Sequence, residues 1–254
     1  VTVDQGNLFA AGQTSMRFDG INDYIHIPDS VLINTAAVTE RTVELVFNAD
    51  ITTGRQVLFE EGGGTNALTI YIDSGDIYFN VRDSGEYGPF TISTGITAGV
   101  TYHTAVTFDS VTTNLFTGYL NGVAIGTGAT ATDLDAHSGD IGIGAQNNAN
   151  HYHDGADNGA LDHEFQGRIS DVALYNTTLS LADIQERSDI VAGLLPGAAG
   201  AVDDELYGGD GADIFYGGEG RDSFVFESAS AFNNVDEINN FGYTERDALD
   251  ISDL

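Results

Sequence analysis

The stretch that decides the fold reads Leu68-Thr69-Ile70-Tyr71-Ile72-Asp73-Ser74-Gly75-Asp76-Ile77-Tyr78-Phe79-Asn80-Val81. In both halves every second residue is a large aliphatic or Phe side chain, which is the period of a strand that buries one face. Between the halves, residues 73–76 are turn formers that include a glycine. The stretch therefore predicts an antiparallel hairpin with one apolar face.

The same pattern continues on both sides of this hairpin, from about Ser15 to Tyr175, as short alternating runs separated by Gly, Asp, Asn and Ser. Asn121-Gly122 predicts a second two-residue hairpin between residues 116–120 and 123–125, because both residues tolerate positive φ. With 254 residues and 41% hydrophobic content, the chain can bury a core. This part is expected to be an antiparallel β-sandwich.

One helix is predicted after the sandwich. Ser180 and Asp183 can cap its start, and Ile184, Ile190 and Val191 give it an apolar side that should close the sandwich. Residues 195–200, rich in Pro, Gly and Ala, then break the pattern. We expect two domains, 1–196 and 197–254.

A nine-residue period follows the break, reading Gly208-Gly209-Asp210-Gly211-Ala212-Asp213-Ile214-Phe215-Tyr216 and then Gly217-Gly218-Glu219-Gly220-Arg221-Asp222-Ser223-Phe224-Val225. A degenerate copy at residues 199–207 precedes them. Each unit predicts a glycine-rich turn and a short strand, so the chain should coil into a short parallel β-roll. Carbonyl and carboxylate oxygens at the turns suit calcium.

These repeats resemble the RTX nonapeptide family. The resemblance implies several Ca²⁺ ions held between turns two repeats apart. One ion is implied at Gly200, Val202, Asp204, Gly217, Glu219 and Asp222, with Val202 where the family has Gly. A second ion is implied at Gly209, Gly211 and Asp213, with Asp236 as the substitute for a missing repeat. Residues 223–254 resemble the closing cap of type I secreted proteins, and the sequence is expected to stop before the secretion signal.

Residues 16–25, 102–109 and 165–175 resemble the laminin-G-like branch of the concanavalin-A-like jelly rolls, with Tyr102 where the family usually has Trp. The resemblance implies a jelly-roll sandwich over residues 15–188 that binds glycans, proteins or peptides. It also places a tight loop, Asp19, Asn22 and Asp23, near Asp171 of the last strand. Calcium is predicted there; the alternative is that these side chains only hold a turn.

A long polar loop at residues 146–164 is the most unusual stretch of the sandwich, and loops of this kind often carry function. Pentraxins, which are related in fold, bind calcium and ligand through the loop at this place. The predicted ligand-binding residues are Asp83, Tyr87, Asn147, Asn148, His151, His153, Asp154 and Asp157. Two alternatives stay open: a zinc or nickel site at His151, His153 and His163 with Asp154, or an ordinary solvated loop.

Composition narrows the function classes. The chain has 39 acidic and 8 basic residues, a net charge of −31, which disfavours nucleic acid as a partner and favours bound divalent cations. Solubility in salty surroundings is an alternative reason for this charge, and both can hold. It has no cysteine. Neither a membrane span nor a signal peptide is visible, and Met16 is the only methionine, so the sequence is interpreted as a piece of a longer protein.

Catalysis is not expected. The glycosidases of this fold need carboxylates that alternate on one strand, and no Glu-x-Asp-x-x-Glu run is present. His103 beside Tyr102 could suggest lyase chemistry, but its position on a predicted strand favours a packed histidine.

The sequence thus predicts an all-β protein: an antiparallel jelly-roll sandwich with one short C-terminal helix, then a short parallel β-roll with a cap. We predict a calcium-dependent, lectin-like module of a secreted bacterial RTX adhesin, exported by type I secretion and monomeric as a fragment. It should attach to extracellular glycans, because calcium-bridged sugar binding needs no Trp and the chain has none. The alternatives are a peptide- or protein-binding adhesin module and a structural cap for export.

Overall fold

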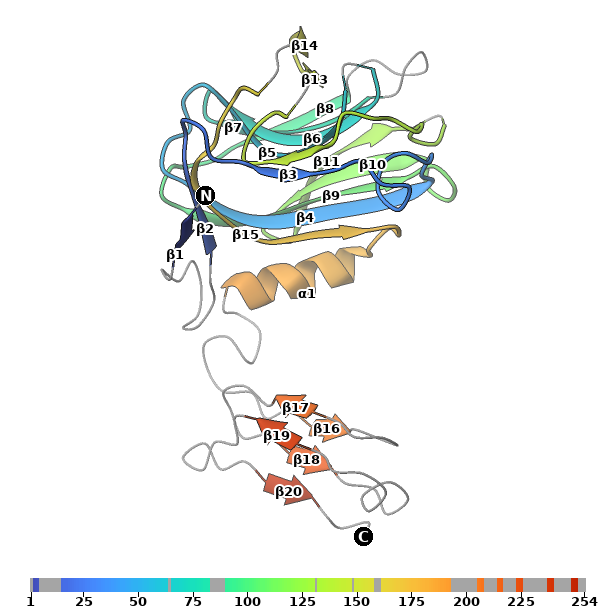
Figure 1. The fold of residues 1–254 in the computed structure, drawn as a ribbon. Coiled ribbons are helices and arrows are strands. Elements are labelled where there is room, and N and C mark those ends of the chain that lie inside the picture. The colour runs from blue at the N-terminus through green and yellow to red at the C-terminus, as the bar shows by residue number, and fades with distance from the viewer. Residues whose placement is uncertain are drawn as a thin grey trace. The chain divides into compact units, whose positions relative to one another are not determined.

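A computed structural model of the chain describes residues 2–4, 15–63, 65–82, 90–130, 132–147, 149–157 and 161–192, and five short strands within residues 205–250 (Figure 1). The chain forms two compact units, residues 1–188 and 189–254. This division falls inside the helix, somewhat before the expected boundary at residue 196. Within the described residues, no helix is both long and apolar enough to span a bilayer.

A seven-stranded antiparallel sheet forms one layer of the first unit, in the order β1-β2-β15-β4-β9-β10-β11. Its strands are β1 (Thr2–Asp4), β2 (Ser15–Asp19), β4 (Glu40–Ala49), β9 (Thr101–Asp109), β10 (Leu115–Leu120), β11 (Val123–Ala129) and β15 (Gln166–Tyr175). The predicted Asn121-Gly122 hairpin is confirmed, since Leu120 pairs with Val123 and both turn residues have positive φ.

A six-stranded sheet forms the second layer, in the order β3-β12-β5-β6-β7-β8. Its strands are β3 (Ile25–Ile27), β5 (Arg55–Gly62), β6 (Ala67–Asp73), β7 (Asp76–Arg82), β8 (Phe90–Gly95) and β12 (Ile141–Ile143). Asp73 pairs with Asp76 across Ser74-Gly75, with φ of 52° and 96° at the two turn residues. The hairpin predicted from the deciding stretch is therefore confirmed.

The core lies between the two sheets and is built from the inward residues of both. Fully buried members from the two layers include Phe18, Leu45, Phe47, Leu58, Ile70, Phe79, Phe108 and Phe116. Because side chains alternate along each strand, the same pattern sends Thr69, Tyr71 and Tyr78 to the outer face of the six-stranded sheet. The jelly-roll sandwich expected from the sequence is present.

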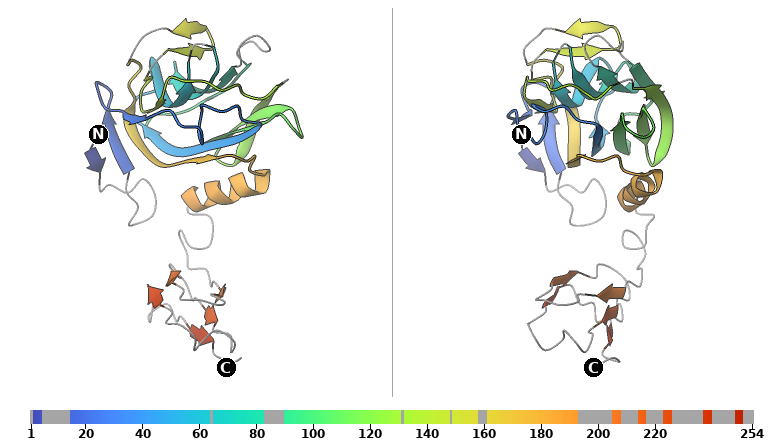
Figure 2. Two further views of the ribbon diagram at one scale, coloured as in Figure 1. Left: turned by 45° about the vertical axis from the view of Figure 1, so that its right-hand side comes forward. Right: turned by 90° about the vertical axis from the view of Figure 1, so that its right-hand side faces the viewer.

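Helix α1 (Leu181–Ala192) begins where the sequence predicts it. Ser180 and Asp183 cap it reciprocally: the Asp183 amide donates to Ser180 Oγ at 3.2 Å, and the Ser180 amide donates to Asp183 Oδ2 at 2.9 Å. Ile184 packs on Ala105 and Tyr119. Figure 2 shows that the helix lies along the outer side of the seven-stranded sheet rather than closing an end of the sandwich.

The second unit carries five strands of three residues each: β16 (Glu205–Tyr207), β17 (Ile214–Tyr216), β18 (Ser223–Val225), β19 (Glu237–Asn239) and β20 (Ala248–Asp250). Alternate strands pair in parallel, β16-β18-β20 in one sheet and β17-β19 in another. The first three strands begin nine residues apart, as the repeat requires. Successive repeats therefore contribute to opposite sheets, which is the arrangement of a coiled β-roll.

Two neighbouring glutamates of β5 are fully buried. Glu61 accepts a 2.8 Å hydrogen bond from Arg41 Nη1, whereas Glu60 Oε2 has no hydrogen-bond partner among the described residues. Burial raises the pKa of Glu60 to about 8 and that of Glu61 to about 7, the latter opposed by Arg41. Glu60 is therefore a carboxyl group that the fold prefers to keep protonated.

Replacing Glu60 by Gln is expected to stabilise the sandwich increasingly as pH rises. The folded pKa lies above the unfolded value of 4.5, so the wild type loses stability between about pH 4.5 and 8. Gln has nearly the shape of a protonated Glu side chain but does not titrate. The difference in unfolding free energy between the variant and the wild type should therefore grow by a few kcal/mol over this range. Urea unfolding in metal-free buffer, followed by tyrosine fluorescence, measures it.

The exposed Glu186→Gln change serves as the control for this experiment. It should leave the pH dependence of unfolding as it is in the wild type. A Glu60→Gln protein whose unfolding free energy parallels the wild type from pH 5 to 9 would show that Glu60 is ionised in the fold.

Candidate functional site

The segment at residues 146–157 crosses the outer face of the six-stranded sheet and ends in a small hairpin (Figure 1). The hairpin consists of β13 (Asn150–Tyr152) and β14 (Gly155–Asp157), with Asn150 opposite Asp157 and Tyr152 opposite Gly155. Its turn places His153 and Asp154 at the tip. The segment predicted to bind ligand is therefore a folded hairpin rather than an open loop.

A row of polar side chains on the sheet fastens this segment. The row takes one outward residue from each of three adjacent strands and consists of Glu60, Thr69 and Asn80. Glu60 accepts from the Asn147 amide at 3.0 Å, and Thr69 donates to Asn150 Oδ1 at 3.0 Å. Asn80 donates to the His151 carbonyl. Because all three side chains are buried, these hydrogen bonds are costly to break.

An aromatic cluster anchors the tip of the hairpin. Tyr71 and Tyr78 stack with their centroids 5.0 Å apart, and the His153 ring stacks on Tyr78 at 4.4 Å. Tyr71 Oη donates to His153 Nδ1 at 3.0 Å and accepts from the His153 amide at 2.9 Å. Burial raises the pKa of Tyr71, so its phenol stays a donor. Tyr152 meets Tyr71 edge-on at 4.9 Å.

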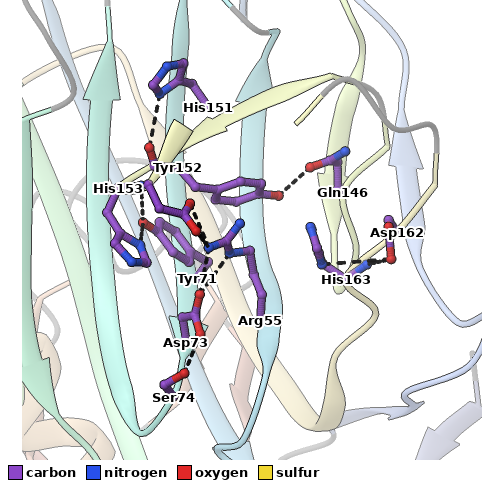
Figure 3. A network of polar contacts seen from close by, with 11 residues as sticks. Arg55, Tyr71, Asp73, Ser74, Gln146, His151, Tyr152, His153, Asp162 and His163 are labelled. Carbon is purple, nitrogen blue, oxygen red and sulfur yellow. Dashed lines mark hydrogen bonds and ion pairs between the residues drawn. The ribbon is translucent and has the colours of Figure 1, made fainter. Parts of the chain in front are cut away.

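Arg55 of β5 links the hairpin to the sheet electrostatically (Figure 3). Its Nε and Nη2 donate to Asp73 Oδ2 at 3.0 and 2.8 Å, and Nη2 also lies 2.8 Å from Asp154 Oδ2. The guanidinium carbon is 4.3 Å from the centroid of the Tyr152 ring. The hydrogen bond from Arg55 lowers the pKa of Asp154. Arg55 therefore shares its single positive charge between Asp73 and Asp154.

The structure brings four predicted ligand residues together on this segment: Asn147, His151, His153 and Asp154. Asp157 lies in β14, opposite Asn150. Asp83, Tyr87 and Asn148 lie outside the described residues. That this segment contacts a ligand stays a prediction.

The three histidines considered for zinc or nickel do not converge. His151 Nδ1 lies 3.1 Å from the Tyr152 carbonyl oxygen, His153 bonds to Tyr71, and His163 meets the Tyr152 ring edge-on. In the part of the chain that the structure describes, no three His, Asp or Glu residues are placed to hold a metal ion. The geometry gives the zinc or nickel alternative no support.

The loop at Asp19 uses its carboxylates to hold its own turn. Asp19 Oδ1 accepts from the Ile21 amide at 2.9 Å and the Asn22 amide at 3.3 Å, and Asp23 Oδ2 accepts from the Asp19 amide. The Ile21 hydrogen bond is the main cause of a lowered pKa at Asp19. This is the arrangement of the turn-holding alternative.

Asp171 lies away from that loop. In the pairing of β2 with β15, Asp19 is opposite Gln166 and Met16 is opposite Ile169, so Asp171 follows the far end of the paired segment. The loop therefore lies beside the last strand, as expected, but at its Gln166 end, and Asp171 is not beside it. Calcium at Asp19, Asn22 and Asp23 stays a prediction.

The calcium positions predicted in the β-roll lie outside the described residues: Gly200, Val202, Asp204, Gly209, Gly211, Asp213, Gly217, Glu219, Asp222 and Asp236. The strands that follow these turns are described and have the expected pairing.

Sequence reasoning missed Arg55, Tyr71, Tyr78 and Tyr152, which position the tip. One signal was available: the alternation that sends Ile70 and Ile72 inward must send Tyr71 and Asp73 outward together. Two aromatic residues near one hairpin turn on an outer face indicate a surface that something covers.

Two family models match the chain. The model described as the concanavalin A-like lectin/glucanases superfamily, a laminin-G-type model, matches residues 19–185. The RTX calcium-binding nonapeptide repeat matches residues 198–224. No curated protein matches the chain.

Solved structures show the same sandwich at low identity. A native heptameric pentraxin from Limulus polyphemus is 16% identical with a TM-score of 0.51, covering 68% of this chain and 80% of that one. The CBM40 of a Ruminococcus gnavus sialidase, bound to α2,3-sialyllactose, is 14% identical with a TM-score of 0.51, covering 72% and 100%. A botulinum neurotoxin serotype G binding domain is 12% identical with a TM-score of 0.54, covering 70% and 43%.

The likeness to these structures concerns the fold, whereas the family model covers most of the sandwich and the repeat model covers the start of the β-roll. The chain belongs to the concanavalin A-like lectin/glucanases superfamily, through a laminin-G-type domain that is followed by RTX calcium-binding repeats.

Proposed function

We propose that the chain is the glycan-binding, calcium-associated part of a secreted RTX adhesin, and that the tip of the β13–β14 hairpin contacts the glycan. The lectin-type fold and the calcium-binding repeats support a carbohydrate-binding module that works with calcium. The R. gnavus relative in fold binds a sialylated sugar. Repeats of this kind are typical of type I secreted proteins, which supports export.

The exposed His153 ring stacked on Tyr78 is the observation that carries this proposal. A flat ring held on a rigid sheet can pack against the apolar face of a sugar, and little conformational entropy is lost because the Tyr71 hydrogen bonds already fix its position. Asp154 beside it offers hydrogen-bond acceptors to sugar hydroxyls. This combination of one aromatic face and few polar groups is common in ligand sites.

Arg55 changes the role expected for calcium at the hairpin. An ion bridging Asp154 to a ligand would have to compete with a guanidinium that binds both oxygens of that carboxylate. We therefore place the calcium dependence of the chain in the repeats and the sugar contact at the hairpin, without a bridging ion at Asp154.

The module is proposed to bind without cleaving. A glycosidase needs one carboxyl group whose pKa is raised so that it can donate a proton. Asp154 has the opposite property, because its hydrogen bond with Arg55 lowers its pKa. Glu60, whose pKa is raised, is fully buried beneath the segment and cannot reach a sugar at the tip.

Replacing His153 by Ala should weaken binding of the strongest glycan found on an array, which should include α2,3-sialyllactose, by roughly three- to tenfold. The loss follows from removing one ring face, and calorimetry measures it. His137→Ala, outside the hairpin, is the control and should bind as the wild type does. An array without any glycan hit would contradict the proposal and favour the peptide- or protein-binding alternative.

Replacing Asp154 by Asn should lower affinity several-fold both in calcium and in EDTA, because a neutral amide loses the charge-assisted bonds that hold the tip on Arg55. Wild-type affinity should change less than twofold between the two buffers. The exposed Asp135→Asn change is the control. If the wild type loses binding in EDTA while the sandwich stays folded, calcium bridges the ligand and the Arg55 interpretation fails.

Calcium removal should unfold the β-roll and leave the sandwich intact. Without the ion the acidic turns repel one another, and an ion at 100 times its Kd adds about 2.7 kcal/mol to stability. Hydrogen exchange should show protection of β16, β17 and β18 only with calcium, while β6 and β7 stay protected in EDTA. Equal protection of β17 in both buffers would contradict the prediction.

A further inference from the structure

The Tyr71 hydroxyl determines which nitrogen of the His153 ring carries the proton (Figure 3). Its oxygen accepts from the His153 amide at 2.9 Å and lies 3.0 Å from His153 Nδ1. Tyr71 is fully buried, and Nδ1 is the one acceptor found for its hydrogen in the described part of the chain. A hydrogen on Nδ1 would leave the phenol hydrogen buried without an acceptor, which is costly. Nδ1 therefore accepts, and a neutral His153 ring carries its hydrogen on Nε2.

This Nε2–H group can donate to a ligand. His153 is exposed, and no hydrogen bond from Nε2 to a described residue is found. Asp154, the next residue at the tip, is also exposed and carries an acceptor carboxylate. The tip thus offers one fixed donor and one acceptor on consecutive residues. A sugar hydroxyl matches both, because it accepts and donates, whereas a carboxylate or sulfate group only accepts.

The charge around the stacked rings is negative. Burial raises the pKa of the Tyr78 phenol, and the carboxylates of Asp76 and Asp73 raise it further. Asp154 acts in the same direction, and Arg55 opposes it. The charged groups that act on this stack are therefore three carboxylates and one guanidinium. Their combined field repels an anionic sugar and leaves a neutral one unaffected.

We propose that the hairpin tip selects neutral glycans over anionic ones, with His153 Nε2–H donating to a sugar hydroxyl and Tyr71 as the positioning residue that keeps Nε2 protonated. This inference rests on the proposed glycan contact and adds the class of sugar and the polarity of the contact. It differs from the sialylated ligand of the R. gnavus structure. That likeness concerns the fold, whereas the charges at the tip belong to this chain.

NMR of the full chain in calcium tests the role of Tyr71 without any sugar. With ¹⁵N-labelled histidine at about pH 8, where an ordinary imidazole is neutral, the ring signals show which nitrogen is protonated. His153→Ala identifies the His153 signals among those of the six histidines. The wild-type ring should be in the Nε2–H form, and Tyr71→Phe should shift the ratio of the two forms roughly five- to tenfold towards Nδ1–H.

Tyr175→Phe is the matched control, because it removes a hydroxyl that donates to Glu44 on the other sheet. It should leave the ratio at His153 as it is in the wild type. A wild-type ring in the Nδ1–H form, or a ratio that Tyr71→Phe leaves unchanged in a folded protein, would overturn the role of Tyr71. The wild-type spectrum gives an answer even where Tyr71→Phe does not fold.

His153→Phe keeps a flat ring and removes the N–H group, so it separates the donor from the ring contact. Calorimetry with the strongest neutral glycan of an array should give an affinity about two- to tenfold below that of the wild type. An affinity equal to or above the wild type, with weakened binding by His153→Ala, would sink the donor and leave the ring contact standing. Wild-type affinity in both variants would remove the glycan contact at His153 as well.

An array printed with neutral oligosaccharides and their sialylated counterparts, lactose and α2,3-sialyllactose among them, tests the class of sugar. With the full chain in calcium, the neutral members should bind about two- to tenfold more strongly, and high salt should narrow the gap by screening exposed charges. Asp76→Asn should narrow it too, whereas the exposed control Asp135→Asn should not. Strongest binding to sialylated members would contradict this inference and leave glycan binding intact, and an array without hits would remove both.

Discussion

The middle strands of the six-stranded sheet, β5, β6 and β7, bury side chains on both faces, and much of the first unit follows from this constraint. Its inward side chains form the core, yet Thr69 and Tyr71 on the outer face are also inaccessible to solvent. Polar groups in such a place need partners, since an unpaired buried group is costly. The segment at residues 146–157 supplies them with an amide, a side-chain carbonyl and a backbone carbonyl. The hydrogen bonds that satisfy the buried polar groups of the sheet therefore also fix the position of the hairpin that carries His153.

The two units differ in how much apolar core they can bury. The sandwich uses a period of two to build a continuous apolar core between its layers. The β-roll uses a period of nine and has strands of only three residues, too short to bury a comparable core. The repeat family to which it belongs binds calcium, so we expect its folding free energy to include that of ion binding. The chain is thus expected to join a domain that folds through its core to one whose folding responds to calcium.

The sequence predicts what depends on neighbouring residues. The turns at Ser74-Gly75 and Asn121-Gly122, the helix start at Ser180 and the spacing of the repeat strands are local features, and the structure confirms them. Only part of the candidate site is formed by residues that are neighbours in the sequence. His153 and Asp154 belong to a recognisable polar segment, but their partners come from distant strands. Arg55 is 99 positions from Asp154, and nothing in their spacing indicates contact.

The register of the sheets was also beyond local reasoning. The placement of β15 between β2 and β4 joins segments that are far apart in sequence. That register separates Asp171 from the Asp19 loop, and a bulge after Ser170 shifts the pairing of the rest of β15 with β4. A family resemblance suggested proximity in general terms, but only the pairing of individual residues could locate either group.

The sharing of Arg55 between two carboxylates has an evolutionary consequence. In a chain with 8 basic and 39 acidic residues, a single guanidinium serves both Asp73 and Asp154. Losing either acid leaves the other still paired with Arg55, so no like-charge repulsion follows. Losing the arginine leaves two like charges at one place and turns attraction into repulsion. A lineage that lost Arg55 would therefore be under selection to lose Asp154 as well, and the two positions should covary across descendants of this domain.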